Sequence, residues 1–334
     1  MTHARLRAAG LALALGTSAA LIAATGALAA TSPSTAWRIV YRSSAKGTQI
    51  LSSVAATGPR HAWAVGQSRT GSIVLQWNGR SWRSMRSFPQ GYLPTSVAAT
   101  GPGNVWVFAD ALHGSPGQYD ALRWNGHAWR AIQLPAAAAG VGTAAVASAT
   151  DVWYSNGQYL AHWNGSAWTC GRTATWVTLA ATAGGSVWRV EAGRVDGSSS
   201  RLVAQRWNGQ DWQWVHLPHP AVADQSGIAV SIESDRNIVI QSKRPTPLGN
   251  RTEPGQVLQW NGRRWRTITE PSWATEWGLA ATGSDSLWAG PNALWTGRSW
   301  IEGHQDGGDY ELAGIPGTSA TWLISGWIML NGRI

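Results

Sequence analysis

The chain has 334 residues, of which 44% are hydrophobic, 13% are charged and 24 are tryptophan. This composition excludes an intrinsically disordered protein and predicts a packed globular core. The formal net charge is +9, but the basic residues are spread along the chain, many of them directly after a tryptophan, as at Arg83, Arg130 and Arg266. Because a nucleic-acid site needs clustered basic residues, we expect no nucleic-acid partner.

Residues 1–29 have the pattern of a secretory signal peptide. Arg5 and Arg7 precede an apolar run, and Ala27-Leu28-Ala29 has the small-x-small pattern of a cleavage site. We therefore expect cleavage after Ala29 and a secreted, extracellular protein with no stable membrane anchor after cleavage. The alternative is an uncleaved anchor, although Gly10 and Gly16 make this run a poor spanning helix.

A strand is predicted at residues 36–41, with the form of a strand that follows a hairpin turn, but no preceding repeat unit is present to which it could belong. Farther along, the chain repeats the motif Trp-Asn-Gly-x-x-Trp, which first occurs at 77–82. Further copies begin at Trp124, Trp163, Trp207 and Trp260, a degraded copy begins at Trp295, and Leu330-Asn331-Gly332 is a truncated one. Asn-Gly between apolar residues is a hairpin signal, because a primed turn needs φ > 0 at both central positions. Each copy is therefore predicted to join two antiparallel strands.

Each repeat also contains two strands ahead of the hairpin. In the first repeat they are Ser53–Thr57, which is made of small residues, and Ala62–Gly66, which contains Trp63. Small residues suit the crowded axis of a radial fold, and a tryptophan fills the space between sheets. The fifth repeat has Val239 where the others have this tryptophan. Four strands per repeat are therefore predicted.

Seven such repeats are recognised, and the last is one strand short. The strand at 36–41 can supply it, so that Asn331-Gly332 and Trp37 rebuild the motif from the two ends of the chain. Closing the ring removes exposed strand edges. The predicted fold class is all-β: a seven-bladed β-propeller of four-stranded antiparallel blades, in which the N-terminal strand completes the last blade. A single propeller domain is predicted at 30–334, with blades at about 49–88, 93–134, 141–170, 176–218, 226–270, 276–303 and 309–334 plus 36–41.

The repeat resembles that of secreted bacterial β-propeller proteins. The residues that carry the resemblance are Val105-Trp106-Val107 followed by 122–129, and the repeat is also loosely similar to that of tectonin-type lectin propellers. The resemblance covers residues 36–334 and implies the propeller scaffold. The tectonin likeness implies sugar binding but identifies no ligand-contacting residue. The Trp-Asp pair of WD40 repeats and the Asp-box of sialidases are absent from the sequence.

Loop lengths predict which face of the ring binds a ligand. The first-to-second strand connections and the Asn-Gly turns are short, whereas the links between repeats and the second-to-third strand connections vary. Long examples of the latter are predicted at Ala109–Asp120, Glu191–Arg201 and Gln241–Gln256. In an up-and-down blade the two variable sets lie on one side, and such variation is typical of a binding face. Neutral drift of exposed loops is the alternative.

Nineteen tryptophans occupy repeat positions and are predicted to pack blade against blade. Trp214 shares a strand face with Trp212, and we expect it to add to this packing. Other aromatic residues lie in or beside the variable links, where they can stack on sugar rings or hold an apolar side chain. The predicted ligand-binding residues are Trp176, Trp273, Trp277, Tyr92 and Tyr310. The alternative is that they close the mouth of the ring or fix loops.

No catalytic residue, metal site or cofactor is predicted. The pair His216 and His219 lacks a third ligand, and the stretch at 306–309 lacks the full ligand series of a calcium loop. Cys170 is the only cysteine, which excludes an intrachain disulfide, and we expect it to be a small buried residue.

The favoured function is a secreted, non-catalytic and monomeric binding module for a carbohydrate, cell-envelope or protein ligand. One alternative is an extracellular glycosidase or polysaccharide lyase with acids at the channel mouth. Candidate acids on the variable face are Asp110, Glu191, Asp196 and Glu276. The other alternative is a purely structural or protein-interaction propeller. Fold alone cannot decide between them.

Overall fold

A computed structural model describes residues 36–42, 49–68, 71–88, 92–111, 121–195, 199–218, 227–243, 255–274, 278–303, 311–325 and 328–333. The chain divides into residues 1–32 and 33–334, and every described residue belongs to the second unit. The predicted signal peptide lies outside the described residues.

The described strands form seven four-stranded antiparallel sheets. The first sheet is β2 (Gln49–Gly58), β3 (His61–Ser68), β4 (Gly71–Trp77) and β5 (Trp82–Phe88). The second is β6 (Tyr92–Gly101), β7 (Asn104–Ala111), β8 (Ala121–Trp124) and β9 (Trp129–Ile132). The third is β10 (Thr143–Ser148), β11 (Asp151–Ser155), β12 (Tyr159–Trp163) and β13 (Trp168–Arg172). The fourth is β14 (Val177–Ala181), β15 (Val187–Val195), β16 (Ser199–Trp207) and β17 (Trp212–Val215).

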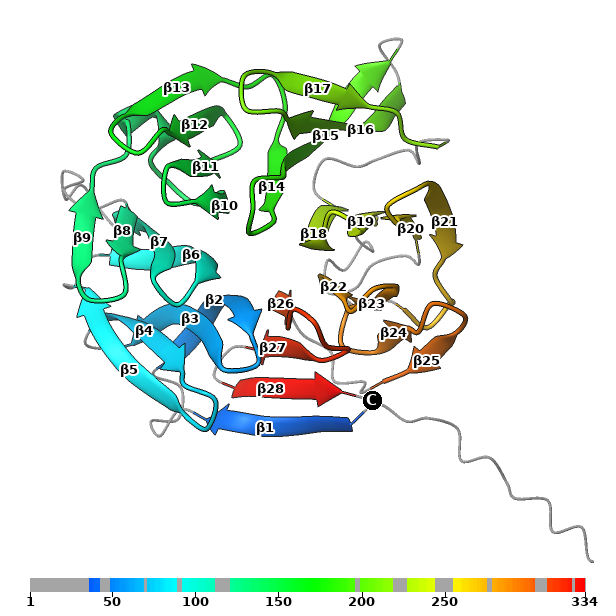
Figure 1. Cartoon of the computed structure of the whole chain (residues 1–334), viewed down its shortest axis with the longest axis horizontal. Coiled ribbons are helices and arrows are strands. Elements are labelled where there is room, and N and C mark those ends of the chain that lie inside the picture. The colour runs from blue at the N-terminus through cyan, green and yellow to red at the C-terminus, as the bar shows by residue number, and fades with distance from the viewer. Residues whose placement is uncertain are drawn as a thin grey trace, which may run out of the picture. The chain divides into compact units, whose positions relative to one another are not determined.

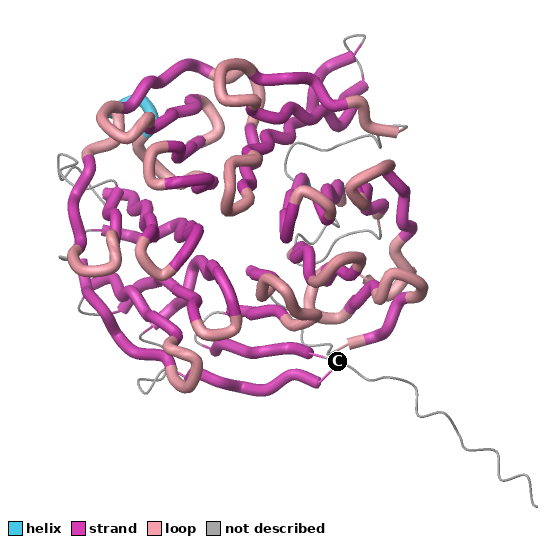
Figure 2. The backbone as a smooth tube through the Cα atoms, viewed as in Figure 1, coloured by secondary structure: helices cyan, strands magenta, loops and turns pink. Residues whose placement is uncertain are grey.

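The remaining sheets follow the same order. The fifth is β18 (Ile228–Ser234), β19 (Asn237–Ser242), β20 (Gln256–Trp260) and β21 (Trp265–Thr269). The sixth is β22 (Leu279–Thr282), β23 (Ser286–Ala289), β24 (Ala293–Trp295) and β25 (Trp300–Glu302). The last is β26 (Glu311–Gly314), β27 (Thr321–Ser325), β28 (Ile328–Arg333) and β1 (Ala36–Arg42). A 3₁₀ turn, η1 (Ala136–Ala138), is cyan in Figure 2.

The sheets are the blades of a β-propeller. Each innermost strand contacts the innermost strand of the next blade, in a circuit that runs β2, β6, β10, β14, β18, β22, β26 and back to β2. Figure 1 views this unit down the axis, with the innermost strands around the centre and strands such as β5 and β9 on the rim. The axis of the ring has two ends. The loop face is the end where innermost strands begin, and the turn face is the opposite end, with turns such as Gly58–His61 and Asn78–Ser81.

The repeated motif forms the hairpin between the third and fourth strands of a blade, but not with the predicted turn geometry. Trp77 and Trp82 face each other across the strands, and the Asn78 N–H donates to the Ser81 carbonyl. The central residues are thus Gly79, with φ 93°, and Arg80, which places Asn78 one position before the centre. The Asn78 side-chain oxygen instead accepts the N–H groups of Arg80 and Ser81 at 3.0 Å. Glycine at the first central position is typical of a II′ turn.

Tryptophans of the motif pack one blade against the next. Trp153 of the third blade lies with its ring centre 4.9 Å from that of Trp207 and 4.8 Å from that of Trp212, both in the fourth blade. The seventh and first blades meet in the same way, through Trp322 and the pair at 77 and 82. Where Val239 replaces the tryptophan, it still joins a cluster with Trp295 of the next blade. Tilted aromatic contacts of this kind stabilise an interface beyond the area they bury.

The strand that closes the ring, β1, pairs with the last strand of the chain as predicted, but in a register that differs from the predicted one. β1 pairs with β28, and the two ends of the ring lie side by side at the bottom of Figure 1. However, Asn331 and Gly332 continue the strand opposite Arg38 and Trp37 rather than turning. A turn is needed only to reverse one continuous chain. Here the two strands come from different ends, and an extended backbone satisfies the ladder hydrogen bonds instead. The prediction of a rebuilt hairpin motif is therefore wrong.

Three further expectations are corrected. Cys170 is an exposed free thiol on the outer strand β13, not a buried residue. Trp214 is 69% exposed on the outer strand β17, so it adds little packing. The connection predicted at Glu191–Arg201 is mostly strand, because β15 and β16 pair as far as Val195 and Ser199. Alternation along an outer strand turns one side toward solvent whatever the residue type, which explains the first two cases.

Candidate binding site

The axis of the ring contains a cavity of about 350 Å³ toward the loop face. Residues from all seven innermost strands or from the positions directly before them line it, mostly near the start of each strand. Its polar side chains are those of Ser53, Thr95, Ser96, Thr143, Thr178 and Glu311. The other lining residues are glycine or apolar residues. The cavity is thus a narrow, mostly neutral chamber with a single carboxyl group.

Glu311, the first residue of β26, bridges the last blade to the first. Its Oε1 accepts a hydrogen bond from Ser53 Oγ at 2.9 Å and one from the Val54 N–H at 3.2 Å. Ser53 Oγ in turn accepts the Val97 N–H of the second blade at 3.0 Å. One chain of hydrogen bonds therefore joins three innermost strands at the closure of the ring.

Burial raises the pKa of the Glu311 carboxyl to about 7, against an ordinary value of 4.5. Loss of hydration disfavours the charged form, and the hydrogen bonds from Ser53 and Val54 oppose this effect without cancelling it. Near neutral pH the group is therefore present in both protonation states. It can donate a hydrogen bond in one state and carry a negative charge in the other.

Hydroxyl groups of the innermost strands also join neighbouring blades. Thr178 Oγ1 donates to the Ile228 carbonyl at 3.4 Å, and Ser231 Oγ accepts the Ala281 N–H at 3.0 Å. Thr95 differs, because its Oγ1 is buried and makes no hydrogen bond to a described residue. The register of β6 shifts between Pro94 and Ser96, so Thr95 is the extra residue of a bulge, and bulges commonly redirect a side chain.

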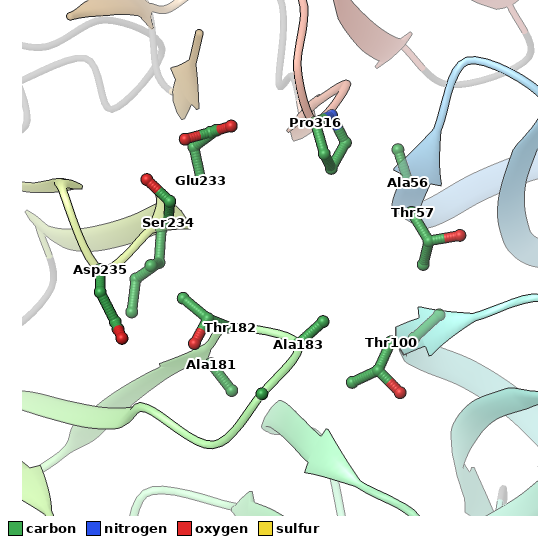
Figure 3. A pocket seen from close by; sticks show the side chains of 13 residues that line it. Ala56, Thr57, Thr100, Ala181, Thr182, Ala183, Glu233, Ser234, Asp235 and Pro316 are labelled. Carbon is green, nitrogen blue, oxygen red and sulfur yellow. The ribbon is translucent and has the colours of Figure 1, made fainter. Parts of the chain in front are cut away.

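A second cavity, of about 270 Å³, lies at the turn face, where innermost strands end. Figure 3 shows residues from several blades around its open centre, among them Glu233, Asp235 and Thr100. Both carboxyls already have partners. Glu233 Oε1 accepts the Gly317 N–H at 3.3 Å, and Asp235 lies 3.9 Å from Arg206. This opening is therefore the weaker candidate.

The predicted aromatic ligand residues are not brought together among the described residues. Trp176 precedes β14, is 44% exposed and covers Gly157, whose added Cβ would lie 2.0 Å from the indole ring. Trp273 is partly buried against the cluster of Val239, and its carbonyl accepts a hydrogen bond from Asn292 at 2.8 Å. Trp176 is thus the one of these two with an open ring face, although it does not line the axial cavity.

The structure describes less of the other three predicted residues. Tyr92 begins β6 opposite Ala111, but nothing is described of its side chain. Trp277 and Tyr310 lie outside the described residues. Their proposed role stays a prediction.

Of the candidate acids on the variable face, Glu191 is described. It pairs with Thr175 and lies 3.7 Å from Arg189, within the fourth blade. The side chain of Asp110 and the whole of Asp196 and Glu276 are outside the description. The same holds for His219 and the stretch at 304–310. Within the described ranges no three His, Cys, Asp or Glu side chains are grouped as metal ligands.

Sequence reasoning missed Glu311, although a signal was present. Strand pairing shows which residues occupy equivalent positions in the blades. Glu311 is equivalent to Ser53, Ser96 and Thr178. Each of these four residues lies two positions before the alanine that pairs with the tryptophan of the second strand. A lone acid in a column that otherwise contains serine, threonine, alanine and glycine marks a position that differs in chemistry. Comparing the repeats column by column would have identified it.

Comparison with known proteins supports the fold only. No family model matches the sequence, and no curated protein sequence matches it. Among solved structures, a streptogramin B lyase has a TM-score of 0.62 at 8% identity, over 90% of this chain and 97% of the other. An inactive virginiamycin B lyase from Staphylococcus aureus, solved with quinupristin, has a TM-score of 0.60 at 9% identity, over 90% and 99%. A chain of the mitotic checkpoint complex has a TM-score of 0.57 at 13% identity, over 98% and 99%.

These similarities show an all-β propeller with four-stranded antiparallel blades. At such low identity, proteins of one fold carry out unrelated functions, so the site itself has to indicate the function. No helix within the described ranges has the length and apolar character required to span a bilayer.

Proposed function

We propose that this protein is a non-catalytic binding module whose ligand enters the axial cavity from the loop face. The observation that carries the proposal is the cavity itself: about 350 Å³, walled by every innermost strand and furnished with hydroxyl groups and Glu311. A preformed hollow with a few directional polar groups among apolar residues is typical of small-ligand sites.

A carbohydrate, free or part of a cell envelope, fits this chemistry best. Sugar hydroxyls are both donors and acceptors, and the Glu311 carboxyl and the threonine hydroxyls can serve them in either sense. The exposed face of Trp176 on the same end of the ring offers a stacking surface for a longer chain. The apolar segment ahead of Ala30 supports export from the cell, and we propose that the protein acts outside it as a monomer.

The test is a glycan array on the purified protein, followed by titration of each hit by calorimetry. Replacing Trp176 by alanine removes the stacking surface and is expected to weaken binding of longer glycans about tenfold or more, equivalent to about 1.4 kcal/mol. Trp214→Ala is the matched control, because Trp214 is an exposed tryptophan of the same blade on its outer strand. A blank array, with peptides and envelope fragments also unbound, would favour a purely structural role instead.

The second candidate is a lyase that uses Glu311 as a general base. A carboxyl with a pKa near 7 suits proton abstraction at neutral pH, and the fold is shared with a streptogramin B lyase. A glycosidase is less favoured, because hydrolysis needs two carboxyls and the described lining of the cavity contains one. Incubation of each array hit with the protein, with Glu311→Gln beside it, checks this candidate: cleavage by the wild type alone would establish catalysis.

A further inference from the structure

One oxygen of the Glu311 carboxyl has no hydrogen-bond partner among the described residues. Both hydrogen bonds of its carboxyl go to Oε1, and Oε2 makes none with any described residue. Glu311 is also the single ionisable residue in the described lining of the axial cavity. A neutral ligand would therefore leave the carboxylate without a counter-charge, and unpaired buried charge is unfavourable.

We propose that the axial cavity binds a small molecule or terminal group that carries a protonated primary amine, with Glu311 Oε2 as its counter-ion. The inference rests on the proposed function, because it uses the same cavity, and it specifies the ligand class. An ammonium group has three donors and no acceptor. It therefore matches a lining in which Glu311 Oε2 has no hydrogen-bond partner among the described residues.

The size of the cavity limits the ligand. At about 30 Å³ per water molecule, 350 Å³ holds on the order of ten waters. A monosaccharide, a lysine side chain or a short aminoalkyl group fits this space, whereas a polymer can enter only by its end. The shared chemistry of these sources is the primary ammonium group.

Charge pairing also predicts how binding depends on pH. An opposite charge beside a carboxylate favours the charged form and lowers its pKa. An amine that stays protonated should thus bind the deprotonated site. With the free carboxyl at a pKa of about 7, the population of that form falls about 30-fold between pH 8 and pH 5.5. The affinity for an ammonium ligand should fall by the same factor, and that for a neutral ligand should not.

The experiment compares 2-aminoethyl glucoside with 2-hydroxyethyl glucoside, which differ at one terminal group, by calorimetry on the full chain at pH 5.5 and pH 8. Nα-acetyl-lysine methylamide is the third probe and tests a protein source. The expected result is binding of at least one amine at pH 8, about 30-fold weaker binding at pH 5.5, and much weaker binding of the hydroxyl analogue. Which amine binds identifies the source.

Two variants test the assignment to Glu311. Glu311→Gln should abolish the preference for amines and its pH dependence, while Glu233→Gln, at the turn-face cavity, should keep both. Circular dichroism checks that each variant is folded. If Glu311→Gln does not fold, the pH profile of amine binding by the wild type remains decisive.

Equal affinity for amine and hydroxyl probes, or amine binding that ignores pH, overturns the inference. Absence of amine binding at pH 8 also overturns it. Glycan binding without amine preference would leave the proposed function standing while this inference fails. If the protein binds amines but no glycan, envelope fragment or protein ligand, this inference stands while the proposed function fails.

Discussion

Glu311→Gln should remove a specific pH dependence from the stability of the propeller. Because the folded state raises the pKa of this carboxyl to about 7 from an ordinary 4.5, the folded protein binds the proton more tightly than the unfolded chain does. The resulting stabilisation is fully present below about pH 4.5 and is lost as the pH rises through 7. The wild type should therefore lose stability over this window because of Glu311.

The magnitude follows from the two pKa values. Each pH unit of difference corresponds to about 1.4 kcal/mol, so the contribution is at most about 3–4 kcal/mol. The real value lies below this bound because Glu311 keeps part of its surface open to the cavity, where water screens the charge. Glutamine has nearly the same shape and does not titrate in this range.

Urea unfolding of both proteins at pH 4.5, 5.5, 6.5 and 7.5 measures the effect. The free energy of unfolding of the wild type minus that of the variant should fall steadily across the series. Replacing the carboxyl by an amide also changes the hydrogen bonds of this side chain. That change does not depend on pH in the variant, so it shifts the whole curve of free-energy difference against pH without changing its slope. Two spectroscopic probes must give coincident transitions for the free energies to be valid. A difference that stays flat within 0.5 kcal/mol, taken as roughly the additivity error of such data, would refute the reasoning.

Three other predictions concern the scaffold. Lys243 and Glu270 form a fully buried ion pair at 3.2 Å. Glu270→Gln should cost about 3–5 kcal/mol, because it removes the negative charge that faces the buried ammonium group, whereas Lys243→Met with Glu270→Leu should cost less. Chemical denaturation measures both costs, and equal costs would argue against the pairing. Gly157→Ala should displace Trp176, because the φ of Gly157 is +86° and the new Cβ would meet the indole. The substitution should lower stability by about 1–3 kcal/mol and change the tryptophan fluorescence. Gly171→Ala is the control, because its Cβ meets nothing within 4 Å. Removing residues 1–42 takes away β1 and should expose the edge of β28. The melting temperature should fall, and light scattering should detect association through the exposed edge. Removing residues 1–35 should have neither effect, and similar behaviour of both truncations would show that β1 is dispensable.

Much of the scaffold was determined locally and was therefore readable from the sequence. The turn between Trp77 and Trp82 uses Asn78 and Gly79, whose amide oxygen and positive φ act within four residues. The tryptophans of the motif are large and apolar wherever they stand, so their burial between blades followed from composition and spacing. The same local logic also marked the strand at 36–41 as lacking a neighbour in sequence.

The tertiary structure alone decided the chemistry of the axis. The pKa of Glu311 is raised because closure of the ring buries its carboxyl. The same closure brings it beside Ser53 and Val54, which lie more than 250 residues away in the sequence. The register of β1 on β28 is likewise set by two chain ends that meet only in space, so the local hairpin rule failed there. Desolvation, and strand pairing between distant segments, depend on which surfaces come together in the folded protein. A repeat motif contains no information about the residues that contact it from other blades.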